Sequence, residues 1–176
     1  RELFPDATLH FLCFTQIRSS VEMLDIVAPE NIATIDARSA LSFVRDTLAF
    51  PWRARRRRID TVINMEAFVR YSCVLSFLSG AGRRVGFHRF NQEGLYTGDL
   101  LTHKVLYNAH IHAAHSFLDL AHALRAPLDR VPLVKRPMAM DCLEVPKITT
   151  DASAAAEIWR KLRALDGDIG PGRKLV

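Results

Sequence analysis

The hydrophobic pattern of residues 59–88 predicts a strand, a helix and a second strand. A short apolar, β-branched run at Thr61–Asn64 is typical of a buried strand. The polar residues at 66–70 lead into a helix with apolar residues at helical spacing, and Gly80 ends it. Val85–Phe87 then predicts the next strand. A unit of this kind joins two parallel strands through a crossover helix.

The same alternation of strand and helix signals runs along most of the chain. Asp36 or Ser39 is expected to cap a helix that begins near Ala40, Pro51 to disturb it, and the arginine-rich segment 53–58 to end it. Other predicted strands cover 8–14 and 31–36, and other predicted helices cover 17–27, 110–124 and 152–165, the last capped by Asp151. The alternation favours an α/β fold with one open parallel sheet that holds all four strands.

Three further segments have weaker patterns. Asn91–Asn108 predicts either a long loop or a hairpin over the sheet edge, and loops of this length are often functional. Val131–Pro146 is rich in proline and is expected to hold one strand. Residues 167–172 have the composition of a linker, and 174–176 resemble a strand that is just starting.

Composition fits a globular domain of ordinary size. The chain has 176 residues, of which 49% are hydrophobic and 24% charged. No apolar run reaches the ~18 residues needed to span a bilayer. Cys13, Cys73 and Cys142 are widely separated in apolar surroundings, which suits buried thiols in a reducing compartment. The net charge of +5 and the pI of about 9.4 point to an anionic partner or surface.

The strongest concentration of charge is the arginine run, which holds five arginines between Arg53 and Arg58. One interpretation is a solvated helix end. Another is contact with an anionic membrane, because Phe50 and Trp52 directly precede the run. Single-stranded nucleic acid is the rival partner, since arginines with aromatic residues also bind it. The residues predicted to contact the membrane are Trp52, Arg55, Arg56, Arg57 and Arg58.

Polar residues follow the two central strands at the edge where open parallel sheets bind ligands. Glu66 and Arg70 come after the first of these strands, and His88 and Arg89 come after the second. In such a sheet these positions face the same crevice. Arginine there is suited to a carboxylate or phosphate. The alternative is a surface ion pair between Glu66 and Arg70 at helical i,i+4 spacing.

The histidines of segment 110–124 are a second candidate for chemistry. His112, His115 and His122 share one helical face with Asp119. This spacing occurs in metal sites, but the sequence has no HExxH motif, so we expect packing or cleft-lining roles and no metal. Walker loops, GxSxG elbows and CxxC pairs are also absent from the sequence. No catalytic residue can be assigned.

Several weak motifs occur in a recognisable order. They are INMEAFVRYSCVLSFLSGAGRRVGF, NQEGLYTGDLLTHKV and HIHAAHSFLDLAHAL. The pattern is an apolar strand that ends in a polar residue, a helix rich in small residues, an Arg-Arg-x-Gly-Phe segment and a helix led by histidine. This order resembles glycosyltransferase family 9, the ADP-heptose:lipopolysaccharide heptosyltransferases, over residues 1–126.

The resemblance implies one half of a two-domain GT-B fold. Residues 1–150 would form the Rossmann-like, acceptor-side domain, 151–172 a helix and interdomain linker, and 173–176 the start of a nucleotide-sugar-binding domain. The family's first strand, with the loop that holds its proposed catalytic base, is expected before Arg1. The donor site is expected after Val176. The segment is therefore not expected to transfer sugar by itself.

The implied reaction is inverting transfer of heptose from ADP-heptose to the inner core of lipopolysaccharide, without a cofactor. The implied partners are the nucleotide-sugar donor, a lipid-linked glycan acceptor and the anionic membrane surface, and not nucleic acid. The implied location is cytoplasmic and peripheral at the inner membrane. Candidate acceptor contacts are Glu66, Arg70, His88 and Arg89, placed by the strand-end argument alone. The alternative function is a non-catalytic basic module that binds nucleic acid or membrane.

Overall fold

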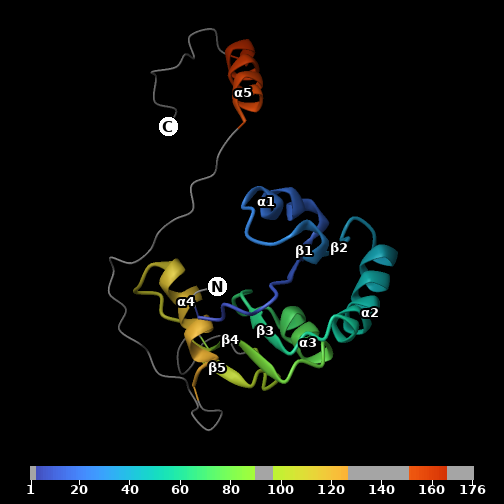
Figure 1. Cartoon of the computed structure of the whole chain (residues 1–176), viewed down its shortest axis with the longest axis vertical. Helices are drawn as coiled ribbons and strands as arrows, with labels where there is room; N and C mark the ends of the chain where they lie inside the picture. The colour runs from blue at the N-terminus through green and yellow to red at the C-terminus, as the bar shows by residue number, and fades with distance from the viewer. Residues whose placement is uncertain (1–2, 90–96, 127–150, 166–176) are drawn as a thin grey trace. The chain divides into compact units, whose positions relative to one another are not determined.

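The computed structural model describes residues 3–89, 97–126 and 151–165 (Figure 1). The chain divides into two compact units, residues 1–143 and residues 144–176, which are described separately below. The predictions for 90–96, 127–150 and 166–176 lie outside the described residues. Among the described helices, none is both long enough and apolar enough to cross a membrane.

The first unit begins with a sheet of two parallel strands. β1 (Phe11–Phe14) pairs with β2 (Ile32–Ile35), and Phe11 is opposite Ile32. Between them lie the 3-10 turn η1 (Thr15–Ile17), α1 (Arg18–Met23) and the 3-10 turn η2 (Pro29–Asn31). The helix is shorter than the predicted range 17–27. Its small core is built by Cys13, Val21, Val27 and Ile32.

A second sheet has three parallel strands, in the order β3 (Thr61–Asn64), β4 (Arg83–Arg89) and β5 (His103–Leu106). The crossover helix α3 (Arg70–Leu78) joins the first two strands. Gly80 then takes a left-handed φ of 79°, which ends the helix as predicted. The parallel pairing of β3 with β4 is confirmed. Within the predicted loop or hairpin of 91–108, β5 pairs in parallel with β4, and the choice between loop and hairpin stays a prediction because 91–96 lie outside the described residues.

The main core lies between this second sheet and α4 (Ala113–Ala123). Its buried side chains are Val85, Phe87, Val105, Leu120, Ala123 and Leu124. The helix was predicted over 110–124, and it starts later because His112 caps it: the His112 Nδ1 atom accepts a hydrogen bond of 3.2 Å from the Ala114 N–H. The apolar face of α4 thus covers the strands that carry the candidate site.

The long helix α2 (Ala40–Arg56) connects the two sheets along the chain. Ser39 is its N-cap, which confirms one of the two residues predicted for that role, Asp36 and Ser39. The Ser39 side chain accepts a 3.1 Å hydrogen bond from the Ser42 N–H. The expected disturbance at Pro51 is wrong, because the helix continues for five more residues. Packing sustains it on both sides of the proline: Phe43 lies 5.2 Å from the Tyr71 ring, and Ala54 is buried.

One sequence prediction fails at the level of the sheet. All four predicted strands were expected in one sheet, yet β1 and β2 form a sheet separate from β3–β5. The physical reason is pairing: within the described residues, β1 is hydrogen-bonded to β2 alone and β3 to β4 alone. The chain is therefore mixed α/β with two short parallel sheets.

The Arg57 side chain ties the beginnings of these strands together. Its guanidinium donates hydrogen bonds of 2.8 Å to the Asn31 Oδ1 atom and 2.8 Å to the Glu30 carbonyl, directly before β2. It also lies 3.5 Å from the Nδ1 atom of His10, directly before β1. Burial, and then the Arg57 charge, lower the pKa of His10. Because Arg57 ends α2 and precedes β3, three chain segments meet at one guanidinium.

The second unit contains α5 (Ala152–Leu165), at the predicted position. Asp151 caps it as expected: the Asp151 carboxylate accepts a 3.2 Å hydrogen bond from the Ser153 N–H and a second bond from the Ser153 hydroxyl. These bonds lower the pKa of Asp151. Within the described part of this unit no side chain is buried. The predicted domain boundaries at 150 and 172 stay predictions.

We predict that Arg57→Met lowers the free energy of unfolding by about 0.5–1 kcal/mol, because charge-assisted hydrogen bonds are lost and water replaces them at exposed acceptors. Arg57→Lys should recover only part of the loss, since lysine lacks the planar fork. Urea denaturation measures the effect. Arg53→Met is the control, because the Arg53 guanidinium is not hydrogen-bonded to any other described residue. Equal destabilisation by the two methionine variants would contradict the role of Arg57.

Candidate functional site

The carboxyl ends of β3 and β4 lie at the same edge of their parallel sheet, where the sequence placed its candidate residues. Asn64 is the last residue of β3 and is 5% exposed. Its Oδ1 atom accepts a 3.1 Å hydrogen bond from the Glu66 N–H, and its Nδ2 atom lies 3.2 Å from the Cys73 Sγ atom. The amide therefore fixes the turn that leads from β3 to α3. Sequence analysis gave Asn64 no role, although a polar residue that ends an apolar strand is a usable signal.

Close packing surrounds this amide. A Cβ atom at Gly86 would lie 3.2 Å from the Asn64 Cβ and 3.1 Å from the Leu101 Cδ1 atom. Glycine at this position lets β4 approach the end of β3. Burial raises the pKa of the Cys73 thiol, against smaller opposing effects of its hydrogen bonds to Thr97 and Asn64. Cys73 is thus a buried thiol, as predicted for it and for Cys13.

The segment between Glu66 and Arg70 is a turn rather than the start of a helix. Phe68 has a φ of 62°, a left-handed conformation that a helix excludes, and α3 begins only at Arg70. The two residues therefore lack the i,i+4 relation of a helix. The alternative of a helical surface pair is wrong, and no ion pair joins these two side chains in the part of the chain described.

Arg70 lines an open hollow of about 350 Å³. The other lining residues are Val74, Thr97, Gly98 and Leu100. The far wall is held by Thr97, whose hydroxyl donates a 3.1 Å hydrogen bond to the Phe87 carbonyl near the end of β4. The hollow thus combines apolar walls with one guanidinium, an arrangement suited to a ligand that carries negative charge.

His88 and Arg89 occupy the end of β4 but are not among the described residues that line this hollow. The β4–β5 register shifts between Phe87 and Arg89, an irregularity of the kind that redirects side chains next to binding sites. His88 is 5% exposed. Burial lowers the pKa of His88, and the charge of Lys104 acts in the same direction. The structure therefore brings Arg70 to a hollow, and Glu66, His88 and Arg89 remain candidates by position only.

The arginine run is divided among several tasks. The Arg56 guanidinium lies 4.6 Å from the centre of the Trp52 ring, a cation–π contact. Arg55 extends along the backbone of Gly80, where an added Cβ would lie 3.2 Å from the Arg55 Nε atom. Arg57 makes the internal hydrogen bonds described above. Arg58 follows the helix with a φ of 52°.

A second open hollow of about 350 Å³ lies on this basic surface. Trp52, Arg53, Arg56 and Arg57 line it. Three guanidinium groups and an indole favour an anionic ligand. Membrane contact by Trp52 and by the arginines from 55 to 58 stays a prediction, and the hollow adds Arg53 to that group.

The histidines of α4 have distinct positions. His112 is the N-cap, and His115 is 6% exposed within the helix, in agreement with a packing role. Their ring centres are 6.4 Å apart. In the described ranges, no group of three or more His, Cys, Asp and Glu side chains is placed to hold a metal ion.

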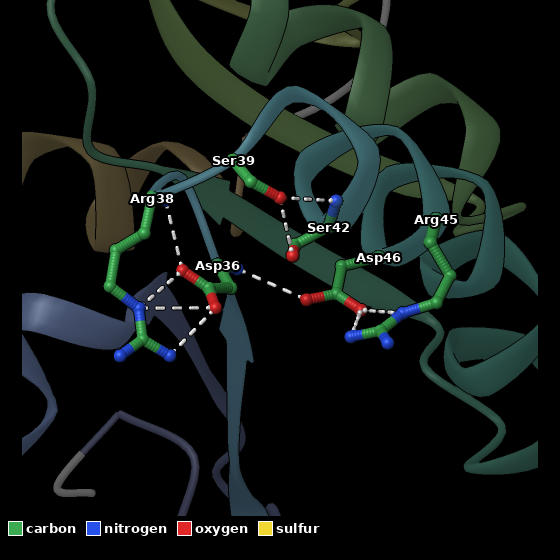
Figure 2. A network of polar contacts seen from close by, with 6 residues as sticks. All are labelled: Asp36, Arg38, Ser39, Ser42, Arg45 and Asp46. Atoms are coloured by element: carbon green, nitrogen blue, oxygen red, sulfur yellow. Dashed lines mark hydrogen bonds and ion pairs between the residues drawn. The ribbon is translucent and has the colours of Figure 1, made fainter.

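A polar network at the carboxyl end of β2 was not found from the sequence (Figure 2). The Asp46 carboxylate accepts a 3.1 Å hydrogen bond from the Asp36 N–H. It also forms an ion pair with Arg45, with 3.0 Å between the guanidinium nitrogen and the carboxylate oxygen. The Asp36 carboxylate binds the guanidinium of Arg38 at 2.8 Å. The side-chain hydrogen bond from Arg38 lowers the pKa of Asp36 to about 2. The hydrogen bond from the Asp36 N–H is the largest of the effects that lower the pKa of Asp46.

This network secures the entry to α2 and is not part of either hollow. Asp46 is only 6% exposed and sits in the second turn of the helix. Asp46 is an acidic residue in a helix that is otherwise rich in arginine, and this is visible in the sequence. Its backbone partner, the Asp36 N–H, lies ten residues earlier. Helical periodicity alone does not identify such a contact.

Comparison with known proteins finds no matching family model, no matching curated protein and no matching solved structure. The function proposed below therefore depends on the geometry and on the family resemblance given above.

We predict that Gly86→Ala lowers the free energy of unfolding by about 1–3 kcal/mol, because the new methyl group overpacks the contact with Asn64. Gly82→Ala is a matched control, since a Cβ there would have no neighbour within 4 Å. That control should be neutral or stabilise by about 0.5 kcal/mol through the unfolded chain. Thermal and urea unfolding of both variants provide the measurement. If the two variants have the same stability, Gly86 has no packing role.

We also predict acid sensitivity from the Asp36–Asp46 network. Because both carboxylates have a folded pKa below the unfolded value, their stabilisation is present above about pH 4 and is lost as the pH falls toward 2. Asp46→Asn should lower the free energy of unfolding at pH 6, because the charge that pairs with Arg45 and strengthens the bond from the Asp36 N–H is lost. It should also show a smaller further loss between pH 6 and pH 3.

Urea denaturation at the two pH values measures this difference. Asp25→Asn is the control, because Asp25 lies outside the network and its φ of 49° is one that asparagine also adopts. A wild-type pH dependence that Asp46→Asn leaves intact would assign the acid sensitivity to other groups.

Proposed function

We propose that this chain is the acceptor-side half of an inverting glycosyltransferase that resembles family 9. The observation that carries the proposal is the hollow lined by Arg70, the first residue of α3, which follows the carboxyl edge of β3. Open parallel sheets bind ligands at this edge. The acceptor in the proposed reaction is a lipopolysaccharide inner core, whose anionic groups suit an arginine next to apolar walls.

The order of the strands supports the proposed Rossmann-like fold. A doubly wound sheet has the order 3-2-1-4-5-6. If β1 to β5 occupy positions 2 to 6 of that order, β2 lies beside β1 on one side of position 1. On the other side, β3, β4 and β5 follow one another. In the proposed fold, one further parallel strand pairs with both β1 and β3 and makes one continuous sheet. The loop after that strand would carry the catalytic base.

The remaining parts of the reaction are assigned elsewhere in the full-length enzyme: the base to the loop named above, and the donor site to a second domain. Inverting transfer needs a base near the acceptor hydroxyl and a site that stabilises the departing nucleotide diphosphate. The hollow beside Arg70 supplies neither group. Its role in the proposal is to position the acceptor, which lowers the barrier only when a donor is bound opposite. The nucleotide-sugar, proposed to be ADP-heptose, belongs to that second domain.

The second candidate is a non-catalytic basic module. The hollow lined by Trp52, Arg53, Arg56 and Arg57 favours it, because these side chains suit phosphate groups. In that function the Arg70 hollow would have no acceptor to hold. The two functions are separated by whether Arg70 affects sugar transfer in the intact enzyme.

We predict that Arg70→Ala raises the KM for the acceptor by about tenfold, equivalent to about 1.4 kcal/mol, because a charge-assisted hydrogen bond is lost. The KM for the donor should change little. The measurement is release of ADP from ADP-heptose by the full-length enzyme with a lipopolysaccharide acceptor. Arg83→Ala is a matched control, because Arg83 is exposed at the start of β4 and lines neither hollow.

Equal changes in both KM values would show that Arg70 is structural rather than an acceptor contact. Full-length protein without any acceptor-dependent ADP release would contradict the proposed function itself.

A further inference from the structure

The outward side of α2 carries an apolar stripe that the fold leaves exposed. Leu41, Val44, Leu48 and Trp52 follow one another at spacings of three or four residues, so they share one face of the helix. Their exposed fractions are 82%, 51%, 73% and 59%. The opposite side packs inward, since Asp46 and Ala54 are buried. An exposed apolar stripe on a helix that already has a buried face indicates an interaction surface.

The charges beside this stripe are all positive. Asp46 is the only acidic residue of α2, and it is buried and paired with Arg45. Arg53, Arg55 and Arg56 are exposed, and none forms an ion pair with a described acidic residue. Arg56 also stacks on Trp52, which joins the charged and the apolar parts of the surface. A helix with an apolar stripe, tryptophan and arginines has the composition of an interfacial membrane helix.

We propose that α2 lies along an anionic membrane surface, with Leu41, Val44 and Leu48 inserted at the boundary between headgroups and acyl chains. Trp52 then lies at headgroup level, and the hollow beside it takes lipid phosphates. The membrane contact predicted from the sequence used only Trp52 and the arginines. Here Leu41, Val44 and Leu48, one to three turns earlier in the helix, supply part of the affinity for the membrane. The proposal goes beyond the proposed function and extends the membrane contact predicted from the sequence.

Two other occupants fit the surface less well. A second copy of the chain that pairs with this face in parallel would bring two sets of arginines together, which like-charge repulsion opposes, and an antiparallel pairing would leave the arginines without an anionic partner. Single-stranded nucleic acid would use the arginines and Trp52, but Leu41 and Leu48 have no aromatic face for base stacking. The membrane alone uses both the aliphatic stripe and the positive charge.

The proposal predicts how binding responds to salt. Attachment by charge alone is screened as ionic strength rises. An inserted aliphatic stripe retains part of its affinity, since apolar burial is not screened. Binding to vesicles with 30% anionic lipid should therefore fall between about 0.05 and 0.5 M NaCl and then level off above zero.

The experiment uses the 176-residue chain with Trp159→Phe, which leaves Trp52 as its single tryptophan. Vesicles of phosphatidylcholine with 30% phosphatidylglycerol should shift the Trp52 emission to shorter wavelength, and brominated acyl chains should quench it. In the same background, Leu41→Ser with Leu48→Ser should weaken the partition coefficient at 0.5 M NaCl by at least about tenfold. Leu165→Ser is the matched control, because Leu165 is equally exposed, at 84%, on α5. Circular dichroism checks that each variant folds.

Unchanged vesicle binding by the double serine variant, or absence of quenching of Trp52, would overturn the proposal. So would a wild-type dimer in sedimentation that the double variant converts to monomer, because the stripe would then be a protein interface. The vesicle measurement contains no sugar or nucleotide. Its failure is therefore distinguishable from a failure of glycosyl transfer, which only the ADP-release assay reports.

Discussion

The hydrogen bonds of Arg57 are the constraint on which the arrangement of the first unit depends. The two short sheets are not hydrogen-bonded to each other within the described residues, so their relation must come from the segments between them. Arg57 supplies one link, because it follows α2, precedes β3 and binds the backbone and Asn31 at the start of β2. The packing of α2 on β2 and on α3 supplies another, with the Phe43 ring 5.2 Å from the Tyr71 ring.

Local pattern was sufficient to predict the unit from β3 to β4. Its strand, helix and strand each have an unbroken hydrophobic signal, Gly80 marks the helix end, and parallel pairing follows from the crossover. For α5 the Asp151 cap and the periodicity were also sufficient. In the candidate site, the strand-end argument led to Arg70, which the structure places on the wall of a hollow. The strand, helix and cap predictions are confirmed, because neighbours in sequence decide them, whereas the acceptor role of Arg70 stays a prediction.

The features that sequence did not reveal depend on contacts between distant residues or on backbone conformation. Phe68 takes a left-handed φ, and this delays the start of α3, although phenylalanine gives no turn signal. Asn64 and Asp46 act through backbone N–H groups that periodicity does not locate. The separation of the sheets depends on which strands pair, and an apolar strand pattern does not specify its neighbours.

The arginine run shows why a charged segment cannot be assigned a single role. Successive residues of an α-helix are rotated by about 100° around its axis, so adjacent arginines point in different directions. Arg56 stacks on Trp52, whereas the Arg57 guanidinium donates a hydrogen bond to the Asn31 side chain directly before β2. Neutralising the whole run would therefore mix a loss of fold stability with a loss of surface charge. Leu41 and Leu48 do not have this ambiguity, because their exposure separates them from the core, and the membrane proposal is best judged at these two positions.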